Sequence, residues 1–258
     1  MRHPDLLTLV FIGLGGLALL FLVAPIAGLL LQSSVPEIVD TIRDKEVCGS
    51  IFLSLWTAMG ATFLFGICAV PLAWILARKE FPGKKIVSAV IDLPLMIPHS
   101  AAGIALLTIL SRRSILGQAA HDAGFSFIGN PSGIMAAMAF VSLPFLINSA
   151  RTGFEAVDER LEKSAMNLGA SSIRAFFTIT LPLAWRAVIA GIVLMFGRGM
   201  SEFGAVIIVA YHPMTAPVLI YERFGAYGLR YARPAAIVFI GICLVAFVIL
   251  RVIAERNR

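Results

Sequence analysis

The stretch LGASSIRAFFTITLP, residues 168–182, is a polar interlude between two long apolar segments of a chain that is 59% hydrophobic. Just before it, Asp158 can cap a helix that begins at Glu159. The apolar side chains of that helix recur at helical spacing on one face: Leu161, Ala165 and Leu168. Gly169 then suits a left-handed C-terminal cap, so we expect the helix to end there in a tight turn.

A second helix is expected directly after the turn. Ser171 can cap it, and Pro182 marks the join to the next apolar segment. Three apolar side chains would share its face: Ile173, Phe176 and Phe177. The region is then a helix, a glycine turn and a helix, too short and too polar to cross a bilayer. The region either connects two spans or forms a docking surface for a soluble partner. We favour the docking surface, because the loop expected at residues 78–85 shows that a simple connector can be much shorter.

Outward from this stretch, apolar runs of membrane-spanning length dominate the chain. It has 258 residues, a mean hydropathy of +0.91 and only 14% charged residues. In lipid every backbone polar group must be bonded within its segment, so these runs predict helices. We expect an all-α integral membrane protein with six transmembrane helices, near residues 6–31, 51–77, 86–110, 131–150, 187–211 and 234–250.

The remaining segments are expected to be loops and one folded module. Residues 1–49 would hold the first transmembrane helix and an external loop, and residues 50–258 would hold five further spans. Residues 111–130 and 212–233 are expected as loops, and the polar module would occupy about residues 155–182, between spans four and five.

The basic residues indicate the topology. Six spans place both termini on one side. If that side is the cytoplasm, 13 of the 21 Lys and Arg residues lie inside and seven outside, with Arg198 in mid-span. We therefore expect a multi-pass protein of the cell membrane with both termini and the polar module in the cytoplasm. The net charge of +6 follows from the same bias, so it does not indicate a nucleic-acid partner.

Two charged residues stand in the fifth apolar run. Arg198 and Glu202 lie four positions apart and can form an ion pair. Charges at membrane depth usually face a bundle interior or a water path, so the pair is either a gate element or a structural tie between helices. An arginine already paired with a glutamate is a poor fixed site for a dianion, which suggests a transient passage.

The third apolar run carries one acid and two prolines. Pro94 and Pro98 remove helical hydrogen bonds, and we expect them to bend or break this span. Asp92 is expected to be structural, with one of three cationic partners: Lys84, Lys85 or Arg198.

Other chemistries find little support. The three cysteines and four histidines show no metal-ligand spacing, and no GxxxxGK[ST] phosphate loop occurs. Energy for transport must then come from a partner or from an ion gradient, so a secondary transporter remains an alternative. His99 and Ser201 lack the sequence context of an intramembrane serine protease.

The polar module resembles the cytoplasmic loop of ABC importer permeases, which reads Glu-Ala-Ala, three residues, Gly, nine residues, Ile-x-Leu-Pro. Gly169 is followed by nine residues and then by Ile179-Thr180-Leu181-Pro182. The opening triad aligns with Lys163-Ser164-Ala165, of which only the alanine matches, and the acid lies one position earlier. The resemblance implies these ATPase-coupling residues: Leu161, Glu162, Ala165, Leu168, Gly169, Ala170, Ser171 and Pro182.

Further stretches resemble the oxyanion branch of that family, whose members carry molybdate, tungstate or sulfate. They are DLPLMIPHSAAGIALL (92–107), SEFGAV (201–206) and AYHPMTAPVLIYERF (210–224), the last being most similar to archaeal molybdate/tungstate permeases. The similarity covers about residues 50–251. It implies a translocation path or gate at the following positions: Pro98, His99, Ser100, Arg198, Ser201 and Glu202.

The resemblance also implies partners. Such a permease works as a homodimer in membrane lipid, with two cytoplasmic ATPase subunits and an external oxyanion-binding protein. ATP and Mg²⁺ are then used by the ATPase, and this chain itself needs no cofactor and is not an enzyme. The interlude would carry the motion of the ATPases as a coupling helix.

Overall fold

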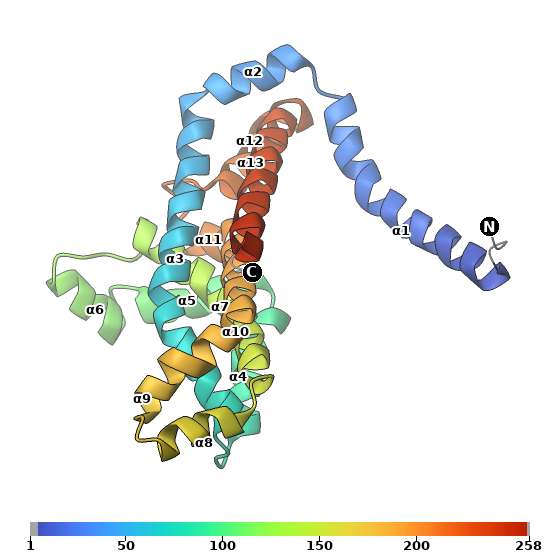
Figure 1. The fold of residues 1–258 in the computed structure, drawn as a ribbon. Coiled ribbons are helices and arrows are strands. Elements are labelled where there is room, and N and C mark those ends of the chain that lie inside the picture. Colours follow the sequence, from blue (N-terminus) through green and yellow to red (C-terminus); the bar gives the residue numbers. More distant parts are fainter. Residues whose placement is uncertain (1–4, 257–258) are drawn as a thin grey trace.

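The computed structural model describes residues 5–256, with side chains through Val252, and that part of the chain contains helices and no strand (Figure 1). Four single helices are long and apolar enough to cross a bilayer: α1 (Leu6–Leu31), α3 (Lys45–Arg78), α7 (Pro131–Glu155) and α13 (Leu229–Arg256). A fifth span, Ser172–Met200, joins α9 (Ser172–Ala175), the π-helical segment η1 (Phe176–Thr180) and α10 (Leu181–Met200). Arg2 and Arg258, two of the 13 basic residues expected on the inner side, lie outside the described residues.

The sixth candidate span is the pair α4 (Lys84–Met96) and α5 (His99–Leu110), which is bent by 116° at the break between them. This confirms the all-α fold with six spans and the predicted break in the third. Pro94 lies inside α4, but the chain leaves the helix only at Ile97, and Pro98 then begins α5 as its N-cap. The fixed φ of proline and its missing N–H suit that first position of the new helix.

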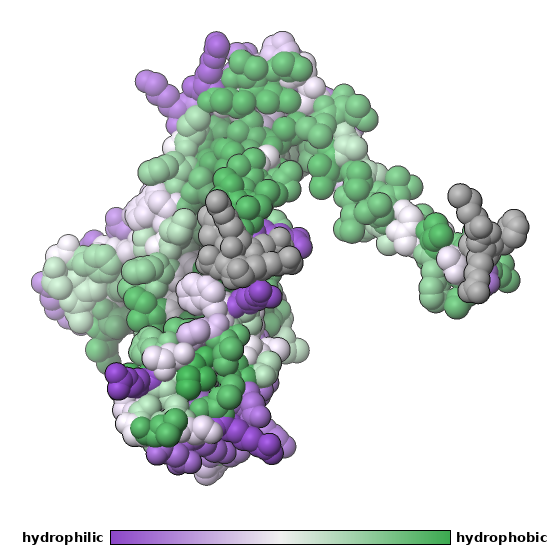
Figure 2. All heavy atoms as spheres, viewed as in Figure 1, coloured by the Kyte–Doolittle hydropathy of each residue, from purple (hydrophilic) through white to green (hydrophobic). Residues whose placement is uncertain are grey.

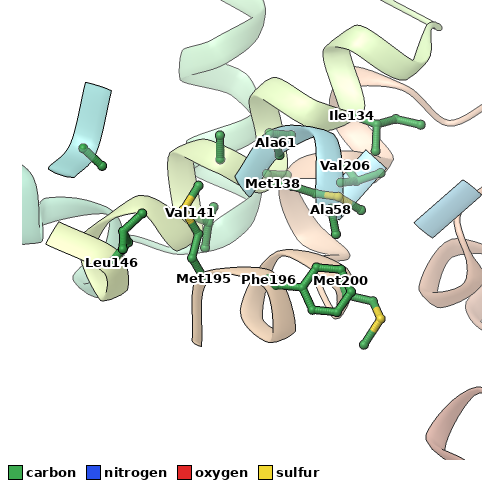
Figure 3. Packing of buried hydrophobic residues seen from close by; sticks show 14 of the residues in the cluster. Ala58, Ala61, Ile134, Met138, Val141, Leu146, Met195, Phe196, Met200 and Val206 are labelled. Carbon is green, nitrogen blue, oxygen red and sulfur yellow. The ribbon is translucent and has the colours of Figure 1, made fainter. Parts of the chain in front are cut away.

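Three helices form the centre of the molecule. α7 packs against α3 and α10, and α10 also contacts α3. Figure 3 shows the buried side chains where they meet, with alanines of α3 facing larger residues of α7 and α10. Small residues let helix backbones approach closely, which is how helices gain packing contacts in lipid. The fully buried residues there include Ala58, Met138, Val141 and Met195.

α1 stands apart from this centre. It runs away from the other helices in Figure 1, and none of its residues is buried. Its surface is apolar along most of its length (Figure 2). The next segment corrects the sequence prediction, because the expected external loop contains α2 (Val35–Arg43). Ser34 and Glu37 form a reciprocal capping box that starts this amphipathic helix.

Three other boundaries differ from the prediction. The expected loops contain α6 (Ile115–Asp122) and α12 (Ala216–Tyr227), and the fifth apolar run ends at Met200 before α11 (Gly204–Val209). α12 begins where Ser54 of α3 accepts a hydrogen bond from the backbone N–H of Ala216 at 2.8 Å. A cap supplied by another helix leaves no signal in the local sequence, whereas Pro217 in the first turn of α12 is a local start signal that the prediction of a loop does not use.

Candidate functional site

The polar module begins as predicted. Asp158 accepts a hydrogen bond from the backbone N–H of Arg160 at 2.9 Å and caps α8 (Glu159–Asn167). At the other end Gly169 adopts a φ of +93°. Its N–H donates to the carbonyl of Met166, and the N–H of Ala170 donates to that of Ala165, both at 3.0 Å. This pair of bonds is a Schellman motif, and it turns the chain sharply at the end of α8.

The second half of the module differs from the prediction. Ser171 does cap a helix, accepting a hydrogen bond from Arg174 N–H at 3.3 Å, but that helix runs through η1 into α10 without a break. Pro182 therefore lies inside a continuous helix rather than at a join. In a regular α-helix its ring would collide with the carbonyl four residues earlier, and the wider π turn just before it relieves that conflict.

The predicted common face of Ile173, Phe176 and Phe177 is divided by burial, although the rings of Phe176 and Phe177 lie 5.0 Å apart. Ile173 and Phe177 are exposed, whereas Phe176 packs between Trp74 of α3 and Phe154 of α7, with ring centroids 5.8 Å from each. The π turn changes the angular spacing of side chains, so a period of 3.6 residues misassigns this face.

Two predicted coupling residues present apolar surface at the tip of the module. Leu161 is 47% exposed and Leu168 is 89% exposed, while Ala165 between them is half-buried. Gly169 and Ser171 are exposed beside them. The lowest edge of the molecule in Figure 2 is largely hydrophilic, with hydrophobic patches beside it. Apolar side chains that protrude from a polar surface are typical of a contact site for another protein.

Glu162 points the other way. Its carboxylate lies 2.8 Å from the guanidinium of Arg78, the last residue of α3, and its side chain is only 11% exposed. Arg78 Nη2 also donates to the carbonyl of Val157 at 2.8 Å. The neighbouring Lys163 instead pairs with Glu159 on the outer surface. Glu162 lies one position before the place where the family motif has its glutamate, and it is this side chain that points into the protein.

A second cluster forms where two breaks in the helices meet. Glu202 lies in the turn between α10 and α11, and Oε2 is 2.8 Å from Arg198 Nη2 and from His99 Nδ1, without the alignment of a hydrogen bond to either. Its other oxygen accepts the N–H of Ala205 at 2.9 Å. The predicted Arg198–Glu202 pair is confirmed, although Glu202 lies beyond the end of the helix.

His99 joins this cluster from the first turn of α5. Its ring nitrogens lie 2.8 and 2.9 Å from Arg198 Nη2. Gly204 allows the start of α11 to lie against the start of α5, because a Cβ at this position would lie 2.7 Å from the Cβ of His99. The carboxylate of Glu202 is fully buried, whereas the side chains of Arg198 and His99 are 24% and 38% exposed. The accessible side of the cluster is therefore basic.

The other predicted path residues surround this point without joining the ion pairs. Pro98 and Ser100 are exposed beside His99, and the hydroxyl of Ser201 donates to the carbonyl of Arg198 at 3.1 Å. Asp92 does not take a cationic partner as expected. It accepts a hydrogen bond from the amide of Asn148 at 2.7 Å, and this contact joins α4 to α7.

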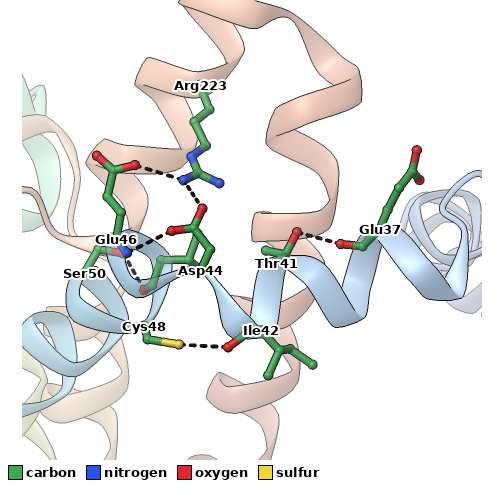
Figure 4. Close-up of polar contacts among 9 residues, drawn as sticks. Glu37, Thr41, Ile42, Asp44, Glu46, Cys48, Ser50 and Arg223 are labelled. Carbon is green, nitrogen blue, oxygen red and sulfur yellow. Dashed lines mark hydrogen bonds and ion pairs between the residues drawn. The ribbon is translucent and has the colours of Figure 1, made fainter.

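A cluster of ion pairs at the opposite end of α3, here called the latch, is not predicted by the sequence analysis. Arg223 of α12 lies 2.6 Å from Asp44 and 2.9 Å from Glu46, which tie α12 to the start of α3 (Figure 4). Burial alone would raise the pKa of Asp44, but the hydrogen bonds from Arg223 and from the N–H of Glu46 outweigh it and hold that pKa below its usual value. Both acids have basic neighbours in sequence, Arg43 and Lys45, so the local pattern does not point to Arg223, which lies 179 positions after Asp44.

Comparison with known proteins agrees with these features. Residues 69–258 match the family described as binding-protein-dependent transport system inner membrane component. The molybdate/tungstate transport system permease protein WtpB of Thermococcus kodakarensis is 44% identical, over 96% of each chain. The probable sulfate transport system permease protein cysT of Chlorokybus atmophyticus is 35% identical, over 86% of this chain and 80% of that protein.

The fold also matches a solved transporter. A bacterial alginate ABC transporter, solved in complex with an alginate-bound periplasmic protein, has a chain that superposes with a TM-score of 0.75 at 18% identity, covering 98% of this chain and 94% of its own. With a capped helical module between two spans and a family match over most of its length, this chain belongs to the family of inner membrane components of binding-protein-dependent transport systems.

Proposed function

We propose that this chain is the permease subunit of an ATP-driven importer for molybdate or tungstate. The observation that carries the proposal is the 44% identity to a molybdate/tungstate permease over nearly the whole of both chains. The relative named for sulfate is less similar, at 35% identity. Sulfate is the second candidate, because its tetrahedral dianion has the same charge and a similar shape.

The working transporter would contain two copies of this chain, two ATPase subunits and an external binding protein. The exposed apolar tip of the module, at Leu161, Leu168, Gly169 and Ser171, is the surface that we assign to ATPase docking. ATP and Mg²⁺ act in that partner, and this chain supplies no cofactor. The bias of basic residues supports a cytoplasmic position for the module and for both termini, in the cell membrane.

The cluster of His99, Arg198 and Glu202 is proposed to lie on the translocation path. Two spans are interrupted at this point, and irregular backbone at membrane depth is tolerated where it lines a cavity or is buried in protein. Arg198 is already paired with Glu202, so the cluster would meet a passing dianion without holding it tightly. Selectivity among oxyanions would then reside mainly in the external binding protein.

Reconstitution tests this function. Proteoliposomes containing this chain, the ATPase subunit and the binding protein should take up molybdate or tungstate only when ATP is present. Sulfate uptake at an equal rate would favour the second candidate. Uptake that needs no ATPase subunit and follows an ion gradient would identify a secondary transporter and overturn the proposal.

A further inference from the structure

Arg78 is the residue through which α3 holds the polar module. Its Nε donates to Glu162 at 2.8 Å and its Nη2 donates to the carbonyl of Val157 at the same distance. Val157 lies in the link between α7 and α8, and Glu162 lies in α8 itself. One planar guanidinium thus contacts both the link that leads into the module and the first helix of the module. Its nitrogen donors have the fixed fork geometry that only arginine offers.

This contact differs from the other ion pair of the module. Glu159 and Lys163 belong to the same helix, their side chains are 50% and 65% exposed so that water screens them, and their hydrogen bond lies within α8. Arg78 and Glu162 are 84 positions apart, with side chains only 6% and 11% exposed. A directional contact that is shielded from water and joins two elements can hold them together when one of them moves.

The second helix of the module, which begins at α9 and continues through η1, also contacts this end of α3. Trp74, one turn before Arg78, contacts Phe176 of η1 edge-on with ring centroids 5.8 Å apart. Between these two ties lies a small polar cavity of about 120 Å³, lined by Arg78, Glu162 and Ser172 among others. The module is therefore not packed continuously on α3, and the two ties are its main contacts there.

α3 can bend just above the ties. Pro71 lies inside this helix and lacks an N–H, so the carbonyl of Ile67 has no helical donor. Residues 72–78 form the last two turns of α3, below that weak point. Ala73 and Leu76 in these turns are buried in the core, so a bend at Pro71 would move them together with the module.

We propose that Arg78 is a positioning residue that carries the movement of the ATPase-driven module into α3. The inference rests on the proposed function, because it takes the module to be the part that the ATPases move. α7 and α10 receive that movement through the chain itself, being continuous with the module. Besides its packing on α7 and α10, α3 receives it directly from the module through Arg78, which binds Glu162 and the carbonyl of Val157, and through Trp74 against Phe176.

The test measures oxyanion uptake per ATP hydrolysed by the reconstituted transporter. Arg78→Ala and Glu162→Gln should bind the ATPase normally and still hydrolyse ATP, but their uptake per ATP should fall about tenfold. Glu159→Gln removes the exposed ion pair of the same helix and serves as the matched control, with a ratio like that of the wild type. The exchange Arg78→Glu with Glu162→Arg should recover part of the lost ratio.

A second measurement does not depend on whether the variants fold. Spin labels at Lys79 and Lys163, in a chain whose three cysteines are replaced, report the separation of α3 and α8 in the assembled transporter. The separation should be the same without nucleotide and with ATP bound, because the two parts move together.

Three outcomes would overturn the inference: a changing label separation in the otherwise native chain, a normal uptake ratio in Arg78→Ala and Glu162→Gln, or loss of ATPase binding in those variants. The last would make Arg78 part of the docking surface. Failure of the proposed function is a different result, because the unmodified transporter would then show no ATP-driven oxyanion uptake at all.

Discussion

Gly169 determines the shape of the module at a single position. It ends α8 at a φ of +93° and supplies one of the two hydrogen bonds of the Schellman turn. No atom lies within 4 Å of the place where a Cβ would stand, so a substitution there meets backbone strain and no steric clash with the rest of the protein. The effect of a mutation can therefore be assigned to the turn alone.

Replacing Gly169 with valine should impair the partner contact and leave the membrane part intact. A β-branched residue in the left-handed region costs about 1–2 kcal/mol, which the chain can avoid by opening the turn. Leu168 and Ala170 would then shift relative to α8. We expect Gly169→Val to insert normally, to pull down little ATPase and to transport poorly. Gly169→Asn, which tolerates this φ, is the control, and normal binding and uptake in the valine variant would leave the docking surface without support.

Glu202 should show strong energetic coupling to its two basic neighbours. Its carboxylate is fully buried, so removing Arg198 leaves a poorly compensated charge, at a cost of about 3 kcal/mol. The double change Arg198→Ala with Glu202→Ala should destabilise by less than the sum of the single changes, with an interaction free energy of about 0.5–3 kcal/mol. Thermal unfolding in lipid nanodiscs measures each step. Strict additivity would show that the two side chains do not interact.

The same cluster shows what a sequence can predict about a site. The spacing of Arg198 and Glu202 predicts their ion pair, because four positions make one helical turn. The contact of His99 with Arg198 joins residues 99 positions apart, and it depends on two helix breaks and on Gly204. Local patterns carry no information about such a meeting of distant turns.

At the scale of elements, apolar length predicted every span, whereas the helices between spans depend on weaker signals. The sequence analysis predicts a loop where α2 lies, although the Ser34–Glu37 capping box of this helix is visible in the sequence. α12 takes its first hydrogen bond from Ser54 of α3, which no local pattern reveals. The continuous helix through Pro182 was missed because a π turn, which propensity rules do not anticipate, removes the expected break.

The latch between α12 and the start of α3 should weaken in acid. The pKa of Asp44 is lower in the folded protein than its ordinary value, so the stabilisation is complete above about pH 4 and is lost as the pH falls through the lower folded pKa. Asp44→Asn should therefore unfold more easily than the wild type near neutrality. The difference should be about 0.5–1 kcal/mol, because a third of the Asp44 side chain is exposed.

Thermal unfolding of both proteins across that pH range tests this expectation. The difference in stability between wild type and Asp44→Asn should close in acid, where the native carboxyl is also neutral. Asp40→Asn is the control, since Asp40 is exposed on the adjacent helix α2 and should change stability little at any pH. A difference that stays constant with pH would mean that the charge of Asp44 does not stabilise the latch.

At the scale of the whole molecule, α3 separates two different polar ends. Its 34 residues span about 50 Å at 1.5 Å per residue, more than the thickness of a bilayer. The latch of Asp44 and Arg223 lies at one end, and the contact of Arg78 with the module lies at the other (Figure 1). One helix thus connects the surface that would receive the external binding protein to the surface that would receive the ATPase.

Cysteine labelling can assign each end to its side of the membrane. With the three native cysteines replaced, Ser171→Cys should react with a membrane-impermeant maleimide only when the cytoplasmic side is accessible, and Asp40→Cys only from outside. Both positions are exposed, and a substitution at Asp40 leaves the ion pair of Asp44 with Arg223 intact. The excess of basic residues around the module supports this orientation. Labelling of Ser171→Cys from outside would remove the module from the reach of any cytoplasmic ATPase, and the coupling role of Arg78 would fail with it.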